Sequence, residues 1–399
     1  MLNLLQTLAK ERHEKITALR RHFHAHPELS FLEFETTKRV VQELTSLGYE
    51  NMRVGTAGKE TGVVAELNAH KSGPCFALRA DMDALRMKED SQASYRSQNP
   101  EAMHACGHDA HTAILLGAAA ILRDVADDLP GRVRFIFQPS EESPYQSGAR
   151  AMIAEGVLQG VDAIGGLHVW ASLPSGVVGY RPGAIMASAD EWECTVFGKG
   201  GHGAMPHEAV DPVVAAAQMV GLLQTVISRE TNPLDTAVLT VGRIESGTTF
   251  NIIPDKAFMQ GTVRTFDPAV REATPLKMDR IFRGLGEATQ CKAEFIYKEV
   301  LPPTINDENV TRMAVDVARG LLGGSSEKVL FAPPTMTSED MSLYLQEVPG
   351  TFLLLGIRNE EKGIIAPQHH PQFDVDDDVL PLGSALLAGM AWKYLSEKA

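Results

Sequence analysis

The order of expected strands and helices changes once along this chain of 399 residues and later changes back. In residues 1–184, short apolar runs alternate with helical patterns, which favours an α/β layered domain. Residues 185–298 instead follow the order β-α-β-β-α-β, which is the ferredoxin-like pattern. Residues 299–399 then return to helices and buried strands. A chain of this length exceeds one ordinary core, so we expect a small domain inserted into a larger, discontinuous one.

A second feature is a dense group of metal-binding residue types in residues 104–111, HACGHDAH. The group precedes the apolar residues 112–121, which indicate a buried helix, so it lies where that helix begins. Cys106 and His108 can face one metal ion because Gly107 between them lets the backbone bend. Thiolate and imidazole ligands suit zinc and its first-row neighbours. A buried cysteine among surface histidines explains so short a motif equally well.

Two pairs of carboxylates follow expected buried strands in the first domain. Asp81 and Asp83 come at the end of one strand, and Glu141 and Glu142 follow directly on another. In open α/β sheets, ligands collect at the carboxyl ends of the strands. A turn or a helix cap explains Asp81 and Asp83 as well as a binding site does. The adjacent pair Glu141–Glu142 allows one carboxylate to ligate a metal while its neighbour acts as a base toward water.

Histidines elsewhere in the first domain complete the set of candidate ligands. His168 lies inside an expected strand, where a histidine is more often a core residue than a ligand. His369 and His370 lie in a loop before the last expected helix.

A metal ion with an open position lowers the pKa of bound water to about 7 and polarises a carbonyl group. A Cys/His pair can also attack acyl groups itself, and the residue types alone leave that alternative open.

The candidate residues belong to a series of motifs that runs nearly end to end. The series comprises residues 21–34 (RHFHAHPELSFLEF), 79–85, 104–112, 137–142, 166–169, 198–212 (GKGGHGAMPHEAVDP), 251–254, 261–266, 338–340 and 369–373. In this order the motifs resemble the M20 metallopeptidase family. The resemblance is to the amidohydrolase branch that holds hippurate hydrolases, N-acyl-amino-acid deacylases and plant auxin-conjugate hydrolases.

The resemblance implies a mixed-sheet catalytic domain sandwiched by helices, with the inserted ferredoxin-like α+β domain serving as lid and dimerisation domain. It implies Glu141 as the general base and makes the cysteine a ligand, not a nucleophile. The implied metal ligands are Cys106, His108, Glu142, His168 and His369. His369 is preferred to His370 because the branch's His-x-Pro-x-Phe pattern starts there.

Two positions depart from the wider family in a way that typifies this branch. Cys106 stands where the wider family has a bridging aspartate, and Asp81 stands where it has a histidine. We expect one or two divalent ions per subunit, manganese or zinc, with nickel or cobalt as surrogates.

Three residues of the inserted domain are implied in substrate binding. His202 lies in a glycine-rich turn, and the resemblance makes it a donor to the carbonyl oxygen as charge develops; otherwise it is a plain loop histidine. Asn251 and Arg264 are implied to hold the substrate. Arg264 can pair with the carboxylate of an amino acid through two hydrogen bonds, although a structural salt bridge explains it equally well.

These implications converge on metal-dependent hydrolysis of the amide bond of N-acyl-L-amino acids, hippurate-like or N-acetyl, to a carboxylic acid and a free amino acid. The alternatives are a dipeptidase or carboxypeptidase of the same family, a metal-binding protein without turnover, and a hydrolase with a cysteine nucleophile. An intact Glu141 argues against a mere binder, which has no need of that base.

Composition restricts the partners. A net charge of −14 argues against nucleic acid or an anionic membrane surface, and no apolar run approaches the ~20 residues of a membrane span. The first residues, MLNLLQTLAKERHEK, lack the pattern of a secretory signal, and the four cysteines form no disulfide framework. We therefore expect a cytoplasmic enzyme acting on a small molecule. We also expect a homodimer through the inserted domain, whose edge strands are otherwise open.

Overall fold

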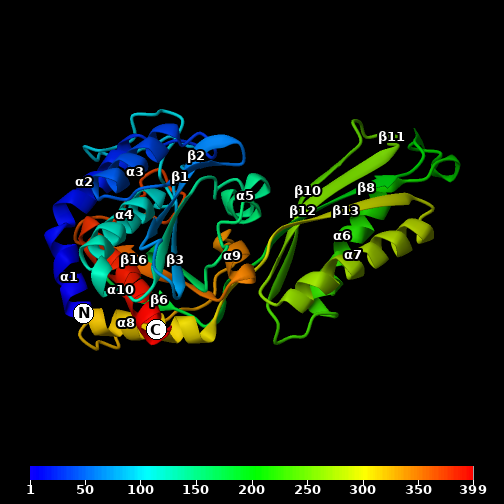
Figure 1. The fold of residues 1–399 in the computed structure, drawn as a ribbon. Coiled ribbons are helices and arrows are strands. Elements are labelled where there is room, and N and C mark those ends of the chain that lie inside the picture. The colour runs from blue at the N-terminus through cyan, green and yellow to red at the C-terminus, as the bar shows by residue number, and fades with distance from the viewer. Residues whose placement is uncertain (399) are drawn as a thin grey trace. The chain divides into compact units, whose positions relative to one another are not determined.

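The computed structural model describes residues 1–398 and divides into two compact units (Figure 1). The first unit combines Met1–Gly183 with Ile305–Pro333 and the chain from Asp340 onward. The second unit combines Ala184–Thr304 with Pro334–Glu339.

An eight-stranded sheet forms the centre of the first unit. Its strands in spatial order are β1 (Arg53–Thr56), β2 (Lys59–Leu67), β4 (Arg132–Gln138), β3 (Cys75–Asp81), β5 (Ala163–Pro174), β16 (Gly350–Arg358), β6 (Val178–Tyr180) and β15 (Val329–Phe331). β3 runs parallel to β4 and β5, and β16 runs parallel to β5, whereas β2 is antiparallel to β4. The sheet is therefore mixed, and the carboxyl ends of its four parallel strands lie along one edge, where α/β folds bind ligands.

Helices cover this sheet on both faces (Figure 1). They are α1 (Leu2–Glu11), α2 (His13–Ala25), α3 (Phe34–Ser46), α4 (His108–Asp124), α5 (Gly148–Ala154), α8 (Glu308–Leu321), α9 (Met341–Glu347) and α10 (Leu380–Lys398). α4 and α10 are buried over most of their length and pack on each other and on β3. Because side chains alternate along a strand, Phe76 and Leu78 join the core with these helices, whereas Arg79 bonds Asp340 at the start of α9. The predicted mixed sheet between helical layers is confirmed.

The second unit contains a four-stranded antiparallel sheet and two helices. Its strands in spatial order are β10 (Ala237–Ser246), β12 (Lys256–Thr265), β8 (Ala189–Phe197) and β13 (Lys292–Leu301), and its helices are α6 (Pro212–Ser228) and α7 (Pro268–Ala288). Asp211 and Asp267 cap the two helices by accepting backbone N–H bonds, and each precedes a proline at the first helical position. Trp192, Met219 and Phe282 belong to the core that the helices form with the sheet.

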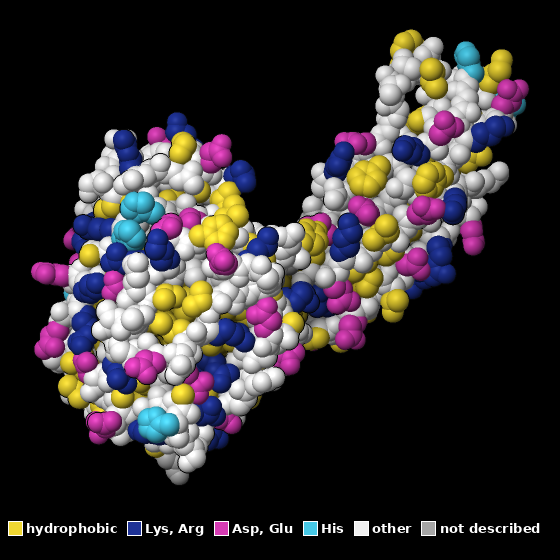
Figure 2. Space-filling view, turned by 45° about the horizontal axis from the view of Figure 1, so that its top comes forward, with side chains coloured by type: hydrophobic (Ala, Val, Ile, Leu, Met, Phe, Trp, Pro, Cys, Tyr) yellow, Lys and Arg dark blue, Asp and Glu magenta, His cyan; other side chains and the backbone are white. Residues whose placement is uncertain are grey.

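Two pairs of short strands complete the fold. They are β9 (Gly201–His202) with β11 (Ile252–Ile253), and β7 (Gly183–Met186) with β14 (Thr304–Asn306). Over the surface that Figure 2 shows, charged side chains of both signs are interspersed with apolar ones. Within residues 1–398, every helix is too short or too polar to cross a membrane.

Candidate metal centre

The carboxyl edge of the eight-stranded sheet collects the candidate ligands of the first unit. His108 is the first residue of α4 and Cys106 lies two residues before it, while Glu142 lies in the loop after β4. His168 lies within β5, and His369 lies in the loop that follows β16. Segments far apart in the sequence therefore contribute to one site because their strands are neighbours in the sheet.

The donor atoms of these residues form two groups that share one sulfur. The groups are Cys106, His108 and His168, and Cys106, Glu142 and His369, with the donor atoms of each group within 4.8 Å of one another. Sγ of Cys106 lies 3.4 Å from Nε2 of His168. On the other side, Nε2 of His369 lies 3.6 Å from Oε1 of Glu142. A shared thiolate between two groups is an arrangement that can hold two cations.

Glu141 lies beside these groups without belonging to either. Its carboxylate forms a separate group with His108 and Glu142, and its Oε2 is 3.9 Å from Nε2 of His108. Its side chain is buried except for 10% of its surface. Glu141 is thus close enough to act on a molecule bound at the donor atoms.

Two orphaned atoms fit a cation between these residues. Nε2 of His108 and Oε1 of Glu142 are buried and have no hydrogen-bond partner among the described residues. Buried polar atoms without partners are rare in folded proteins, and a cation at each of the two donor groups would satisfy them. The combination of sulfur, nitrogen and oxygen donors suits zinc and other first-row metals.

Hydrogen bonds behind the site orient the imidazole rings. Nδ1 of His108 donates to the backbone carbonyl of Asp83 at 2.9 Å, and Nδ1 of His168 donates to that of Val169 at 2.6 Å. A carbonyl can only accept, so both Nδ1 atoms carry a proton. This turns the Nε2 atom of each ring toward the donor groups, as in many metal sites.

Protonation without a bound ion differs among the donors. Burial and the nearby charges of Glu142 and Glu141 outweigh the opposing effect of His108 and raise the pKa of the Cys106 thiol well above its ordinary value. Burial lowers the pKa of His108. The charges of Asp81 and Cys106 oppose this effect and are together larger, so the pKa of His108 is raised well above its ordinary value. Burial and the neighbouring His111 hold the pKa of His168 well below its ordinary value. A binding cation would displace the protons on sulfur and His108, since ligands coordinate in deprotonated form.

Gly107 explains why the cysteine and the histidine can face the same space. Its φ of 98° lies in the left-handed region that favours glycine. A Cβ at this position would lie 2.2 Å from Cγ2 of Val169, which β5 holds in place. Only glycine therefore fits between Cys106 and His108.

Asp81, the last residue of β3, and Asp83, two residues further on, have different partners. Asp81 accepts a hydrogen bond from Nδ1 of His111 at 2.6 Å, and Nε2 of the same ring accepts from the backbone N–H of Val169. The carboxylate of Asp83 accepts from the backbone N–H groups of both Glu141 and Glu142 at 3.0 Å. Both aspartates support the site from behind its donor atoms.

The candidate substrate residues belong to the second unit. His202 pairs with Ile252 across β9 and β11 and is exposed, and its Nδ1 accepts the N–H of Ala204 at 3.1 Å, which leaves Nε2 as its donor. Asn251 lies beside it, since its carbonyl accepts the N–H of Gly203 at 2.8 Å. Arg264 is half-buried on β12 and forms no ion pair with any residue in the described part of the chain.

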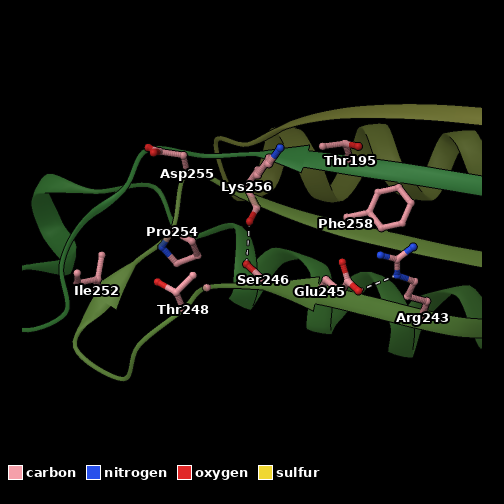
Figure 3. A pocket seen from close by; sticks show the side chains of 11 residues that line it. Thr195, Arg243, Glu245, Ser246, Thr248, Ile252, Pro254, Asp255, Lys256 and Phe258 are labelled. Atoms are coloured by element: carbon pink, nitrogen blue, oxygen red, sulfur yellow. Dashed lines mark hydrogen bonds and ion pairs between the residues drawn. The ribbon is translucent and has the colours of Figure 1, made fainter.

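A pocket of about 690 Å³ also lies in the second unit (Figure 3). Strands β8, β10, β11 and β12 and the loop before β11 line it, and its charged lining includes Arg243, Glu245 and Lys256. Arg243 and Glu245 pair with each other at 2.8 Å. The residues that line this pocket include none of the candidate substrate residues.

A mixed sheet with helices on both faces and a Cys/His/Glu donor cluster at its carboxyl edge suits metal-dependent hydrolysis. Residues 77–393 match the family model described as Peptidase family M20/M25/M40, and the chain belongs to this family. It is 41% identical to thermostable carboxypeptidase 2 of Saccharolobus solfataricus, over 99% of both chains.

Two further relatives are similar over nearly the whole chain. N-acetylcysteine deacetylase of Bacillus subtilis is 39% identical, with 95% of this chain and 96% of that protein covered. The crystal structure of a dinuclear metal-binding peptidase of the M20 family from Bacillus subtilis is 36% identical, with a TM-score of 0.85 over 98% of this chain and 100% of that one. Amide hydrolysis is therefore the chemistry of this protein's family.

Proposed function

We propose that this protein hydrolyses the amide bond of N-acyl-L-amino acids, hippurate-like or N-acetyl, to a carboxylic acid and a free amino acid. One observation carries the proposal. Glu142 belongs to a donor group built on Cys106, whereas its neighbour Glu141 belongs to neither such group yet lies beside both. This separates a ligand from a base within one pair, as metal-assisted hydrolysis requires.

The two donor groups on Cys106 would hold two divalent ions, manganese or zinc, with nickel or cobalt as surrogates. The dinuclear peptidase of Bacillus subtilis supports this number. When bound, such ions polarise a carbonyl oxygen and lower the pKa of water.

Glu141 then takes a proton from the attacking water onto its carboxylate and delivers it to the nitrogen of the leaving amine. His202 donates a hydrogen bond from Nε2 to the carbonyl oxygen as negative charge develops there. Arg264, which has no ion-pair partner among the described residues, holds the carboxylate of the amino acid, and Asn251 also contacts the substrate. The second unit thus serves as the lid of the site.

A carboxypeptidase of the same family is the alternative, because a relative of that name is 41% identical. The deciding experiment is an assay of benzoyl-, acetyl- and indole-acetyl amino acids against dipeptides and longer peptides, with added manganese and with a chelator. We expect chelator-sensitive cleavage of the N-acyl amino acids. Faster cleavage of the peptides would favour the alternative, and activity that survives chelation would favour a cysteine nucleophile.

We further propose that the protein is a cytoplasmic homodimer paired through its second unit. The 17-residue helix α6 contains no charged residue and leaves Val213, Val214 and Leu222 exposed. The edge strand β10 exposes Val238 and Ile244. A second copy would cover both features. Light scattering should give twice the chain mass for the wild type and a monomer for Val214→Glu, and a wild-type monomer would contradict the dimer.

A further inference from the structure

Three consecutive backbone amides before and within the acidic pair are held by two buried carboxyl groups. The N–H of Ser140 donates to Oε1 of Glu33 at 2.8 Å. The next two N–H groups, those of Glu141 and Glu142, donate to the two oxygens of Asp83 at 3.0 Å each. The position of the acidic pair is therefore fixed through its backbone, and Glu33 supplies the first of three hydrogen bonds.

Glu33 serves two strained points of the chain with one oxygen. It directly precedes α3 and is fully buried at 0% exposure. Its Oε1 also accepts the N–H of Phe31 at 3.0 Å. Phe31 and Ser140 have φ values of 57° and 56°, in the left-handed region that residues other than glycine rarely adopt. Such conformations persist only where the surroundings hold them, and Glu33 holds both.

We infer that Glu33 is a positioning residue for the catalytic base: through the amide of Ser140 it fixes the turn from which the Glu141 carboxylate reaches the donor groups. The inference rests on the proposed function, because it takes Glu141 as the base. Glu33 is not a candidate ligand, because its Oε1 accepts the backbone N–H groups of Phe31 and Ser140 and contacts no donor atom of the candidate ligands among the described residues.

Glu33 accepts its two hydrogen bonds as a mostly neutral carboxylic acid. Burial, with the nearby charge of Asp83, raises the pKa of Glu33 to about 8, so the group is mostly neutral at pH 7. Its Oε2 has no hydrogen-bond partner among the described residues. Glutamine keeps the acceptor oxygen at the same reach and should replace Glu33 well, whereas alanine removes it.

The first test compares Glu33→Gln and Glu33→Ala on the best substrate of the panel. We expect kcat of Glu33→Ala to fall by roughly 10- to 100-fold, the scale for a misplaced catalytic group. KM and metal content of this variant should stay unchanged. The kcat of Glu33→Gln should stay within about threefold of the wild-type value. Glu33→Asp, which is too short to reach Ser140 without movement, replaces the alanine variant if that one does not fold.

The matched control is Asp307→Ala. Asp307 accepts two backbone N–H bonds at the start of α8, so its loss should lower stability by about 1 kcal/mol and leave kcat unchanged. A kcat of Glu33→Ala equal to that of the wild type would overturn the inference, as would a loss in Glu33→Gln equal to that in Glu33→Ala.

A second measurement does not depend on turnover. Hydrogen–deuterium exchange of the amides of residues 140–142 should be faster in Glu33→Ala than in wild type and unchanged in Asp307→Ala. Unchanged exchange in Glu33→Ala would overturn the inference even if activity fell. The wild type could cleave none of the substrates in the panel while exchange is still faster in Glu33→Ala. In that case the proposed function fails, and the role of Glu33 in holding the turn at residues 140–142 stands.

Discussion

Sγ of Cys106 lies 3.4 Å from Nε2 of His168, although the two residues are 62 positions apart in the chain. In some enzymes such a pair forms a nucleophilic thiolate and an imidazolium, because the proton moves from sulfur to the ring nitrogen. The environment opposes that use, because burial raises the pKa of the thiol and lowers the pKa of the imidazole. Proton transfer from sulfur to nitrogen is disfavoured at both ends, which leaves coordination of a cation as the better role for both atoms.

Reactivity of Cys106 should therefore depend on the metal. We expect a thiol reagent to label it slowly in the metal-loaded protein and faster after chelation, since ligation holds the sulfur. Peptide mapping separates it from Cys75, Cys194 and Cys291, which are buried and serve as internal controls. Equal labelling rates with and without metal would remove Cys106 from the ligand set.

The acidic pair should divide into a base and a ligand. Glu141→Gln should lower kcat by roughly 10²- to 10⁴-fold, the contribution of a general base, and leave metal content near that of the wild type. Glu142→Gln should lose metal, because it replaces the charged carboxylate, whose Oε1 lies 3.6 Å from Nε2 of His369, with a neutral amide. Metal analysis that finds the ion missing from the Glu141 variant and retained in the Glu142 variant would exchange the two roles.

The sequence predicts the layered fold well, because the spacing of apolar residues indicates the strands and helices and residues such as proline indicate where they begin or end. Apolar runs before Asp81 and Glu141 become β3 and β4, and Asp-Pro pairs open α6 and α7. The sequence also predicts a single helix over residues 3–25 that ends before Pro27, since proline forbids its continuation; the structure has two helices instead. The chain leaves the helical conformation at Arg12, with φ −97° and ψ 2°, and forms α1 and α2.

The site was only partly open to prediction, for a physical reason. Cysteine, histidine and glutamate at strand ends signal their chemistry by residue type. Glu33 and Asp83 act through backbone N–H groups more than 50 residues away, and such contacts have no local pattern. The sequence does not indicate the partner of Asp81 either. His111 lies in the same motif as Cys106, but its ring reaches Asp81 only in the folded chain.

His202 should matter for turnover and not for metal. Its exposed ring has Nε2 available as a donor, since Nδ1 accepts the N–H of Ala204. His202→Ala should lower kcat by roughly 10²-fold, as for loss of an oxyanion donor, with metal content unchanged. His207→Ala is the matched control, because His207 is an exposed histidine in the following turn. Equal kcat values for the two variants would reduce His202 to an ordinary loop residue.

A buried histidine should make stability depend on pH. His24 is buried between Asp109, at 2.8 Å from Nδ1, and Glu89, at 3.3 Å from Nε2. Burial and Arg20 lower its pKa, but Asp109 and Glu89 outweigh them and raise it from 6.5 to about 9. Since the folded-state pKa is the higher one, the stabilisation is complete below pH 6.5 and is lost as the pH rises through about 9.

Urea denaturation at pH 6.5, 7.5 and 9 measures this effect. Between pH 6.5 and 9, the wild type should lose up to about 3 kcal/mol of unfolding free energy through His24, and His24→Gln should lack this part of the slope. His22→Gln serves as control, because His22 lies on the same helix and its pKa is lowered by burial and by His26. If His24→Gln and His22→Gln show the same pH dependence as the wild type, the imidazolium of His24 does not stabilise the fold.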